Sequence, residues 1–144
     1  METIKFSCTI ENNTDFDDLG IEFWLDNTCF FDSIIKKKQT LVNYEFNEDE
    51  ADHVLRIIFK NKTIDHTTVD NTGKILTDAL ITVKDIVFDD INIDQLFFEH
   101  AVYMHNYNST YSTVVDKFYG DLGCNGTVEL KFSTPFYMWL LEHL

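Results

Sequence analysis

The sequence predicts an all-β protein in which residues 1–144 form a single domain, an antiparallel β-sandwich or jelly roll. Two features predict this class. Apolar and polar residues alternate with a period of two through most of the chain, whereas a helical period is almost absent. Clusters of Asp, Asn, Thr and Gly separate the alternating runs, as expected for short strands joined by turns. A chain of 144 residues, 44% of them hydrophobic, is long enough to bury its own core.

The first 60 residues contain five predicted strands. In the first of them, Ile4, Phe6, Cys8 and Ile10 occupy every second position, which is typical of a strand with one buried face. The turn residues Asp26-Asn27-Thr28 join the second and third strands into a hairpin. The five predicted strands are Thr3–Glu11, Ile21–Asp26, Cys29–Ile35, Leu41–Phe46 and His53–Lys60.

The pattern is less regular in the rest of the chain. Thr63–Val69 is short and β-branched, Ile75–Phe88 is one long strand or two broken ones, and Asp89–Leu96 is a helical turn or a short strand. Phe97–Met104 is apolar, so we expect it to be buried. Thr127–Phe132 is the last strand, with Val128, Leu130 and Phe132 on one face. The polar, Tyr-rich segment 106–126 shows little periodicity, and such a segment in a compact domain is usually functional or an interaction surface.

The last nine residues, 136–144, are nearly all apolar and form a short helical or extended tail. On a helix these side chains point in almost every direction, and on a strand they occupy both faces. We therefore expect part of the tail to contact a partner protein or a symmetry mate, with Trp139 as the anchor. Complete burial within the monomer is the alternative. The candidate interface residues are Phe136, Tyr137, Trp139 and Leu140.

The charge of the chain limits its partners. Lys and Arg number 11 against 25 Asp and Glu, which gives a formal net charge of −14. Phosphates of nucleic acids and anionic membrane surfaces repel such a chain, so neither is an expected partner. The first residues, Met-Glu-Thr-Ile-Lys-Phe, lack the basic region and apolar run of a secretion signal.

Two acidic clusters are candidate calcium sites, because calcium takes oxygen ligands from Asp, Asn and loop carbonyls. One cluster is the turn 70–73 with nearby carboxylates, and the other lies within 89–94. Neither has the spacing of an EF-hand loop, and the same residue types are common in ordinary turns. We expect the protein to require no cofactor, and calcium is the one candidate. The candidate ligands are Asp70, Asn71, Asp78, Asp89, Asp90 and Asp94.

Catalysis has little support in the sequence. No serine lies in a nucleophile elbow, and no pair of histidines has the spacing of a zinc site. We therefore expect a protein that binds and is not an enzyme. Exposed aromatic side chains could stack on sugar rings. Trp24 occupies a polar position of its strand, and Tyr103, Tyr107, Tyr111 and Tyr119 lie in or near the irregular segment. The candidate carbohydrate residues are Trp24, Tyr103 and Tyr107.

Several stretches resemble known proteins. They are His-Val-Leu-Arg-Ile-Ile-Phe-Lys-Asn-Lys at 53–62, Ile-Leu-Thr-Asp-Ala-Leu-Ile-Thr-Val-Lys-Asp-Ile-Val-Phe-Asp at 75–89, Phe-Tyr-Gly-Asp-Leu-Gly-Cys-Asn-Gly-Thr-Val at 118–128 and Pro-Phe-Tyr-Met-Trp-Leu-Leu-Glu at 135–142. These stretches look like small structural proteins of tailed bacteriophages of marine bacteria. The middle region is also loosely similar to calcium-dependent xylan-binding carbohydrate-binding modules, which are β-sandwiches.

The first resemblance implies a virion structural or accessory protein that is assembled in the bacterial cytoplasm and docks on other virion proteins or on its own copies. The second implies the alternative, a calcium-dependent carbohydrate-binding module whose partner is a polysaccharide. An enzyme is a distant third. The neighbouring genes would discriminate between the first two, because a tail or capsid operon indicates a virion protein and a glycoside hydrolase gene indicates a carbohydrate module.

Overall fold

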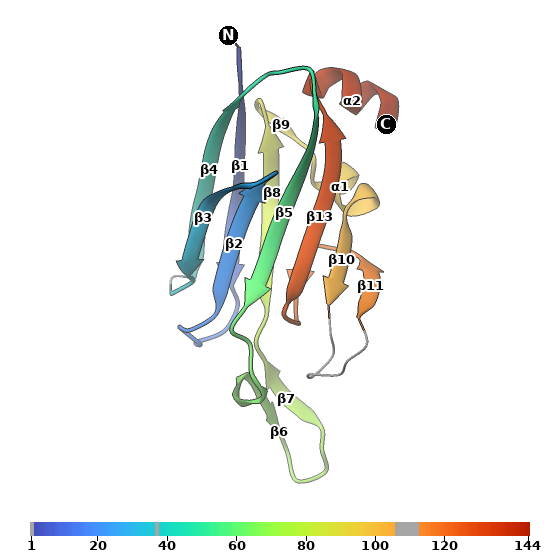
Figure 1. The fold of residues 1–144 in the computed structure, drawn as a ribbon. Coiled ribbons are helices and arrows are strands. Elements are labelled where there is room, and N and C mark those ends of the chain that lie inside the picture. The colour runs from blue at the N-terminus through green and yellow to red at the C-terminus, as the bar shows by residue number, and fades with distance from the viewer. Residues whose placement is uncertain (1, 37, 106–112) are drawn as a thin grey trace.

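The computed structural model describes residues 2–36, 38–105 and 113–144, which form two antiparallel sheets packed face to face (Figure 1). This confirms the predicted antiparallel β-sandwich. Sheet A contains, in spatial order, β12 (Asp121–Leu122), β8 (Ile81–Phe88), β1 (Thr3–Asn12) and β4 (Gln39–Asn47), with β9 (Ile91–Asn92) paired to β8. Sheet B contains β11 (Val114–Lys117), β10 (Val102–His105), β13 (Gly126–Ser133), β5 (Asp52–Lys60), β2 (Gly20–Leu25) and β3 (Thr28–Ile34).

Three further features lie outside the two sheets. A separate hairpin of β6 (Thr67–Val69) and β7 (Ile75–Asp78) follows the 3-10 turn Ile64–His66 and projects from one end of the sandwich (Figure 1). The helices α1 (Asp94–His100) and α2 (Phe136–His143) are short, and α2 lies at the opposite end (Figure 1). Within the described part of the chain, neither helix is long and apolar enough to span a membrane.

The core lies between the two sheets and follows the alternation of the sequence. Phe6 and Phe88 of sheet A contact each other at 5.1 Å between ring centroids, and Phe88 contacts Phe132 of sheet B at 5.4 Å. Phe136 of α2 stacks on Phe88 at 4.3 Å. Because inward residues of both sheets interdigitate in this way, the apolar phase of each strand is buried.

At 75–88 and 89–96 the structure agrees with the alternatives that the sequence left open. The stretch 75–88 forms two strands, β7 and β8, and 89–96 contains both the short strand β9 and the start of α1. The tail is helical. The expectation that all of Phe97–Met104 is buried is wrong, because the segment crosses from α1 into β10. Phe97 and Tyr103 face the core, whereas Val102 is exposed on the outer face of sheet B.

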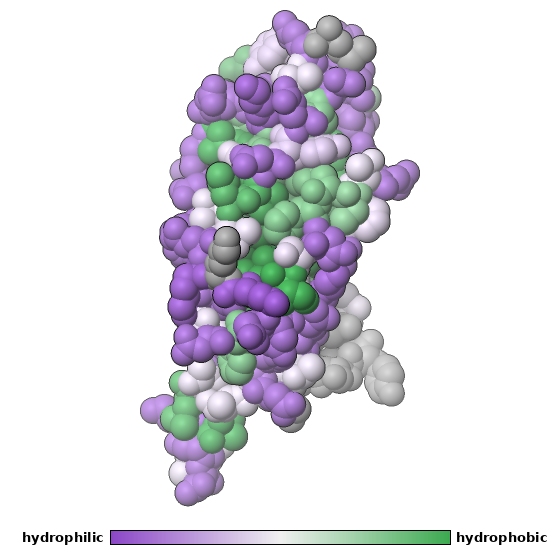
Figure 2. All heavy atoms as spheres, turned by 90° about the vertical axis from the view of Figure 1, so that its left-hand side faces the viewer, coloured by the Kyte–Doolittle hydropathy of each residue, from purple (hydrophilic) through white to green (hydrophobic). Residues whose placement is uncertain are grey.

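One edge of the sandwich is apolar. The edge strands β3 and β4 belong to different sheets and lie along the same side of the molecule, where Phe30 stacks on Tyr44 at 4.1 Å and an interplanar angle of 5°. Figure 2 shows the apolar patch in the middle of this side, with hydrophilic residues around it. Leu41 is 63% exposed here. The Phe30–Tyr44 pair closes the gap between the two sheets along this edge.

Candidate functional site

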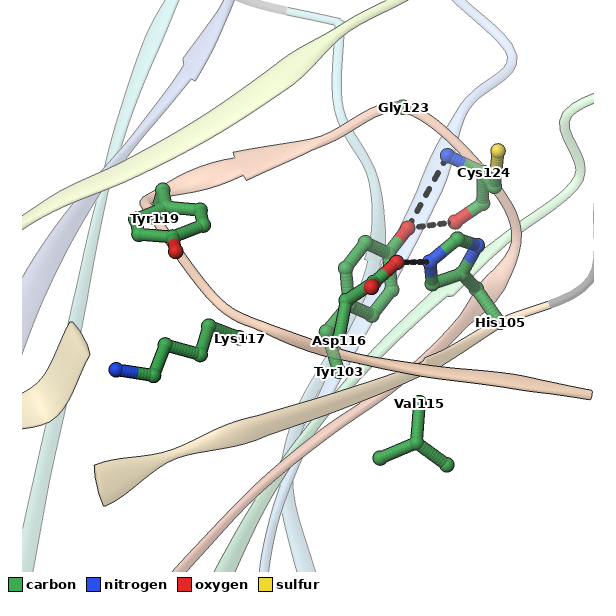
Figure 3. Close-up of a pocket in the computed structure, with 8 residues that line it drawn as sticks. All are labelled: Tyr103, His105, Val115, Asp116, Lys117, Tyr119, Gly123 and Cys124. Carbon is green, nitrogen blue, oxygen red and sulfur yellow. Dashed lines mark hydrogen bonds and ion pairs between the residues drawn. The ribbon is translucent and has the colours of Figure 1, made fainter. Parts of the chain in front are cut away.

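A pocket of about 510 Å³ lies where the outer strands of sheet B, β10 and β11, meet the segment 118–124 (Figure 3). Sheet B has six strands, and β10 and β11 form its far edge. Phe118 is fully buried against Phe97 and Phe98 of α1, and it anchors the segment that forms the other wall. The pocket is lined by Tyr103, His105, Val115, Asp116, Lys117, Tyr119, Gly123 and Cys124.

The pairing of β10 with β11 places three polar side chains on one face. Tyr103 pairs with Asp116 across the strands, and His105 follows Tyr103 by two residues. In a pleated sheet, directly opposed residues and residues two apart point to the same side. His105 Nε2 and Asp116 Oδ2 lie 2.8 Å apart, and the rings of Tyr103 and His105 are 4.4 Å apart. The strand geometry therefore fixes the imidazole and the carboxylate at the wall of the pocket (Figure 3).

The neighbouring loop is held by Tyr103 and by a close backbone approach. The Tyr103 hydroxyl donates to the Cys124 carbonyl oxygen and accepts from the Cys124 amide nitrogen at 3.1 Å. At Gly126, the first residue of β13, a Cβ atom would lie 2.3 Å from the Met104 carbonyl oxygen. Only glycine fits there, because the opposing atom belongs to rigid backbone. The loop 123–125 is thus fixed against β10.

Tyr119 is the most exposed aromatic side chain of the pocket. It is 73% exposed and lies between the buried Phe118 and Gly120, whose φ is +102°. A residue with a side chain is strained at this φ, so glycine allows the turn that separates the anchored Phe118 from β12. In Figure 3 the Tyr119 ring stands across the pocket from Tyr103 and His105. Its apolar ring face is therefore available to a ligand.

Lys62 stabilises the rim of the pocket at Gly123 through hydrogen bonds. Its ammonium group donates to Asp78 Oδ1 at 2.6 Å, to the Ala79 carbonyl at 3.1 Å and to the Gly123 carbonyl. Burial raises the pKa of Asp78, but hydrogen bonds from Lys62 and Thr67 outweigh it and lower that pKa below its usual value. Burial also raises the pKa of the Cys124 thiol. The thiol is therefore protonated at neutral pH. The charges of Lys62 and Asp78 at this rim are held in place by their hydrogen bond.

The structure separates the predicted carbohydrate residues. Trp24 pairs with Arg56 on the outer face of sheet B and donates from Nε1 to Glu22 Oε1 at 2.9 Å. Tyr103 lies on the inner face of the same sheet and is 7% exposed. Tyr107 lies outside the described residues. Of the two described residues, Tyr103 is placed in the pocket, where its hydroxyl holds the loop.

The calcium candidates of the first cluster are not brought together. Asp70 lies at the tip of the β6–β7 hairpin, where its Oδ1 accepts from the amides of Thr72 and Lys74 at 2.8 and 2.9 Å and from the Thr72 hydroxyl. Hydrogen bonds from the Thr72 hydroxyl and these amides lower the pKa of Asp70. Asp78 lies at the base of the hairpin, opposite Thr67. Asn71 is an exposed residue of the turn. The carboxylates of this cluster accept hydrogen bonds within the hairpin and stabilise its turn and its base.

The second calcium cluster is also structural. Asp94 accepts from the amides of Ile86 at 2.6 Å and Asp85 at 3.2 Å, which ties the start of α1 to β8. Asp89 Oδ1 accepts from the Lys5 amide at 2.9 Å, and Asp89 and Asp90 both turn the chain at positive φ. Across residues 2–36, 38–105 and 113–144, no three His, Cys, Asp or Glu side chains are grouped so as to hold a metal ion.

The residues of the predicted partner interface divide between core and surface. Phe136 and Trp139 are each 4% exposed and Leu140 is 9% exposed, because this face of α2 packs on Phe132 and Phe88. Trp139 therefore serves the monomer core and is not available as an anchor for a partner. Tyr137 is 62% exposed, and it is followed by the exposed Met138 and Leu141.

The sequence analysis missed the contact between His105 and Asp116 in the pocket, and the adjacent Lys117. These residues are eleven and twelve positions apart, and nothing in either stretch is a motif. Val-Val-Asp-Lys at 114–117 does not alternate, so the sequence carries no signal for the register that opposes Tyr103 and Asp116.

The comparisons with known proteins add little to this geometry. No family model matches the chain, and no curated protein matches it. Among solved structures, the chain is similar to "vCBM60 in complex with galactobiose", with 13% sequence identity and a TM-score of 0.49. The similarity covers 88% of this chain and 96% of that one.

Proposed function

We propose that the protein is a non-enzymatic carbohydrate-binding domain that binds an oligosaccharide in the pocket between β10–β11 and the segment 118–124. The observation that carries this proposal is Tyr119, which is 73% exposed at the rim of a pocket of about 510 Å³. The opposite wall holds the His105–Asp116 pair. An exposed aromatic face beside fixed charged groups is the combination that a sugar requires.

Each part of the pocket matches a part of a sugar ring. The apolar C–H face of a pyranose packs on an aromatic ring, as other apolar groups do. Its hydroxyls form their strongest hydrogen bonds with charged groups such as Asp116 and Lys117. An ionised carboxylate has about four acceptor positions, so the contact with His105 leaves Asp116 able to accept from sugar hydroxyls.

The first test is the variant Tyr119→Ala. We expect it to weaken binding about tenfold or more, which is about 1.4 kcal/mol, since stacking is lost while the fold is kept. Affinity is measured by titration calorimetry or affinity electrophoresis against galactobiose, xylan and galactan oligosaccharides. Tyr137→Ala removes another exposed tyrosine, 62% exposed on α2, and serves as the matched control. If no sugar in the panel binds, or if both variants bind as the wild type does, the proposal is wrong.

A second variant, Asp116→Asn, tests the polar wall. The amide keeps the size of the side chain but removes its charge, so binding should weaken about threefold to tenfold as the hydrogen bonds lose charge assistance. Unchanged affinity would contradict a role for Asp116 in the pocket.

The virion role, the location in a virus particle and the virion partners that the sequence resemblance implies stay predictions, which neither the fold nor the comparisons test.

A further inference from the structure

A second hollow, at the α2 end of the sandwich, is apolar along most of its length. It is a groove of about 690 Å³ between α2 and the region of β9 and α1. Ile93, Leu96 and Leu140 form its buried floor, each no more than 9% exposed. Ile91, Tyr137, Leu141 and Leu144 project beside it and are 47%, 62%, 69% and 89% exposed. A groove with an apolar floor and apolar walls is a common docking site for a short peptide segment.

The groove continues into an acidic pocket. Ile91 and Tyr137 line both hollows, so the two lie side by side. The second hollow holds about 250 Å³, and four carboxylates reach it from the N-terminal strand, the β4–β5 loop and the β8–β9 turn. These carboxylates are Glu2, Glu48, Glu50 and Asp89.

No Lys or Arg of the described residues lines the acidic pocket. In the described part of the chain, none of the four carboxylates forms an ion pair, whereas Lys38, Lys60, Lys62 and Lys84 are paired elsewhere. Glu48 Oε1 is buried, and no hydrogen-bond partner for it lies among the described residues. A buried carboxylate oxygen without a partner costs free energy, and an incoming cation removes that cost.

We propose that this face docks a segment of a partner protein in which aliphatic side chains stand next to a Lys or Arg. The aliphatic side chains occupy the groove between α2 and β9, and the basic side chain enters the acidic pocket beside Tyr137. Charge selects this occupant over a second copy of the chain. A second copy brings a net charge of −14 and its own acidic pocket, so the two like-charged faces repel. The proposal is independent of sugar binding, which it places in a separate pocket.

The experiment selects short random-sequence peptides on the purified full chain at low salt. We expect the enriched peptides to carry aliphatic residues beside Lys or Arg. A labelled synthetic peptide from this set is then titrated by fluorescence anisotropy. The double variant Tyr137→Ser/Leu141→Ser should weaken binding about tenfold or more, and Glu48→Gln/Glu50→Gln about fivefold, with a smaller dependence on salt. Leu41→Ser, at the exposed β3–β4 edge, is the matched control.

We expect each variant to fold, because all the substituted apolar side chains are exposed. Thermal melting verifies this. The proposal is overturned if the selection returns no binder, if the enriched peptides lack basic residues, or if they bind the Tyr137→Ser/Leu141→Ser variant as tightly as the wild type. Sedimentation that shows a dimer abolished by the same variant would assign the face to a second copy instead. None of these outcomes changes the sugar affinity, so failure here is distinguishable from failure of the carbohydrate proposal.

Discussion

The two ends of the sandwich both contain a histidine beside an aspartate, but they use the pair differently. At the α2 end, His53 lies between Asp26 and Asp49, at 2.6 Å from Nδ1 and 2.7 Å from Nε2, and the rings of Phe46 and Phe132 cover it. At the other end, His105 contacts Asp116 at the wall of an open pocket. A histidine enclosed by two carboxylates and two rings is structural, whereas one beside a pocket is available to organise a binding site.

His53 fastens three segments at the α2 end. Asp26 belongs to the β2–β3 turn, and Asp49 belongs to the β4–β5 loop and also accepts from the Thr134 hydroxyl at 3.0 Å, next to the start of α2. Burial lowers the pKa of His53, but the hydrogen bonds and charges of Asp26 and Asp49 outweigh it and raise that pKa above 6.5. The hydrogen bond from His53 lowers the pKa of Asp49. The contacts of His53 with Asp26 and Asp49 hold the β2–β3 turn and the β4–β5 loop together at the α2 end.

The largest expected effect concerns the aromatic residues of the two ends. Trp139→Ala should cost about 3–5 kcal/mol of unfolding free energy, because it leaves a cavity beside Phe136 and Phe132. Tyr119→Ala at the pocket should change stability by less than about 0.5 kcal/mol, since that ring is exposed. Urea unfolding followed by fluorescence or circular dichroism measures both. A neutral Trp139→Ala would mean that the tail is not core.

The second prediction uses pH to test whether His53 is charged in the folded protein. The pKa of His53 is raised in the folded state, so its stabilisation is complete below about pH 6.5 and is lost as the pH rises through the folded-state value. His53→Gln should therefore cost about 2 kcal/mol at pH 6 and progressively less toward pH 9. Urea unfolding across this range measures the cost. His100→Gln, at an exposed histidine, is the control. A cost that does not vary with pH would contradict a charged interaction of His53 with Asp26 and Asp49.

A smaller effect is expected at the acidic turns. Asp94→Ala should cost about 1–2 kcal/mol, because two amides of the β8 backbone lose their acceptor. Asp70→Ala, at the exposed hairpin turn, should cost about 0.5–1 kcal/mol. Thermal melts in millimolar calcium and in chelator show whether a cation contributes. If calcium raises the wild-type melting temperature and Asp94→Ala abolishes that rise, the carboxylate is a ligand and not a cap.

The central strands could be predicted from the sequence because each has one buried face. Thr3–Glu11 and His53–Lys60 alternate over their whole length, and the structure places them at Thr3–Asn12 and Asp52–Lys60. Of α1, only a helical turn or a short strand at 89–96 was predicted, because the helix has seven residues, too few to show a helical period. The hairpin of β10 and β11 was missed because each strand has four residues.

The candidate site was harder to predict than the fold, since its parts come from separate elements. Tyr119 stood out only as one of several tyrosines in an irregular segment, and the burial of Phe118 and the turn at Gly120 make it project. Asp116 has no local signal, because its role depends on the register that opposes it to Tyr103. The calcium candidates stay predictions, since Asp residues that cap backbone amides resemble calcium ligands in sequence.

The most direct test of the carbohydrate proposal is a titration of the ¹⁵N-labelled protein with galactobiose or xylo-oligosaccharides, followed by amide chemical shifts. We predict saturable shifts at Lys117, Tyr119, Gly123 and Cys124, which line the pocket, and none along α2. Tyr119→Ala should move the midpoint of these shifts to a sugar concentration about tenfold higher or more. Shifts confined to the outer face of sheet B around Trp24, or no shifts with any sugar, would contradict the account.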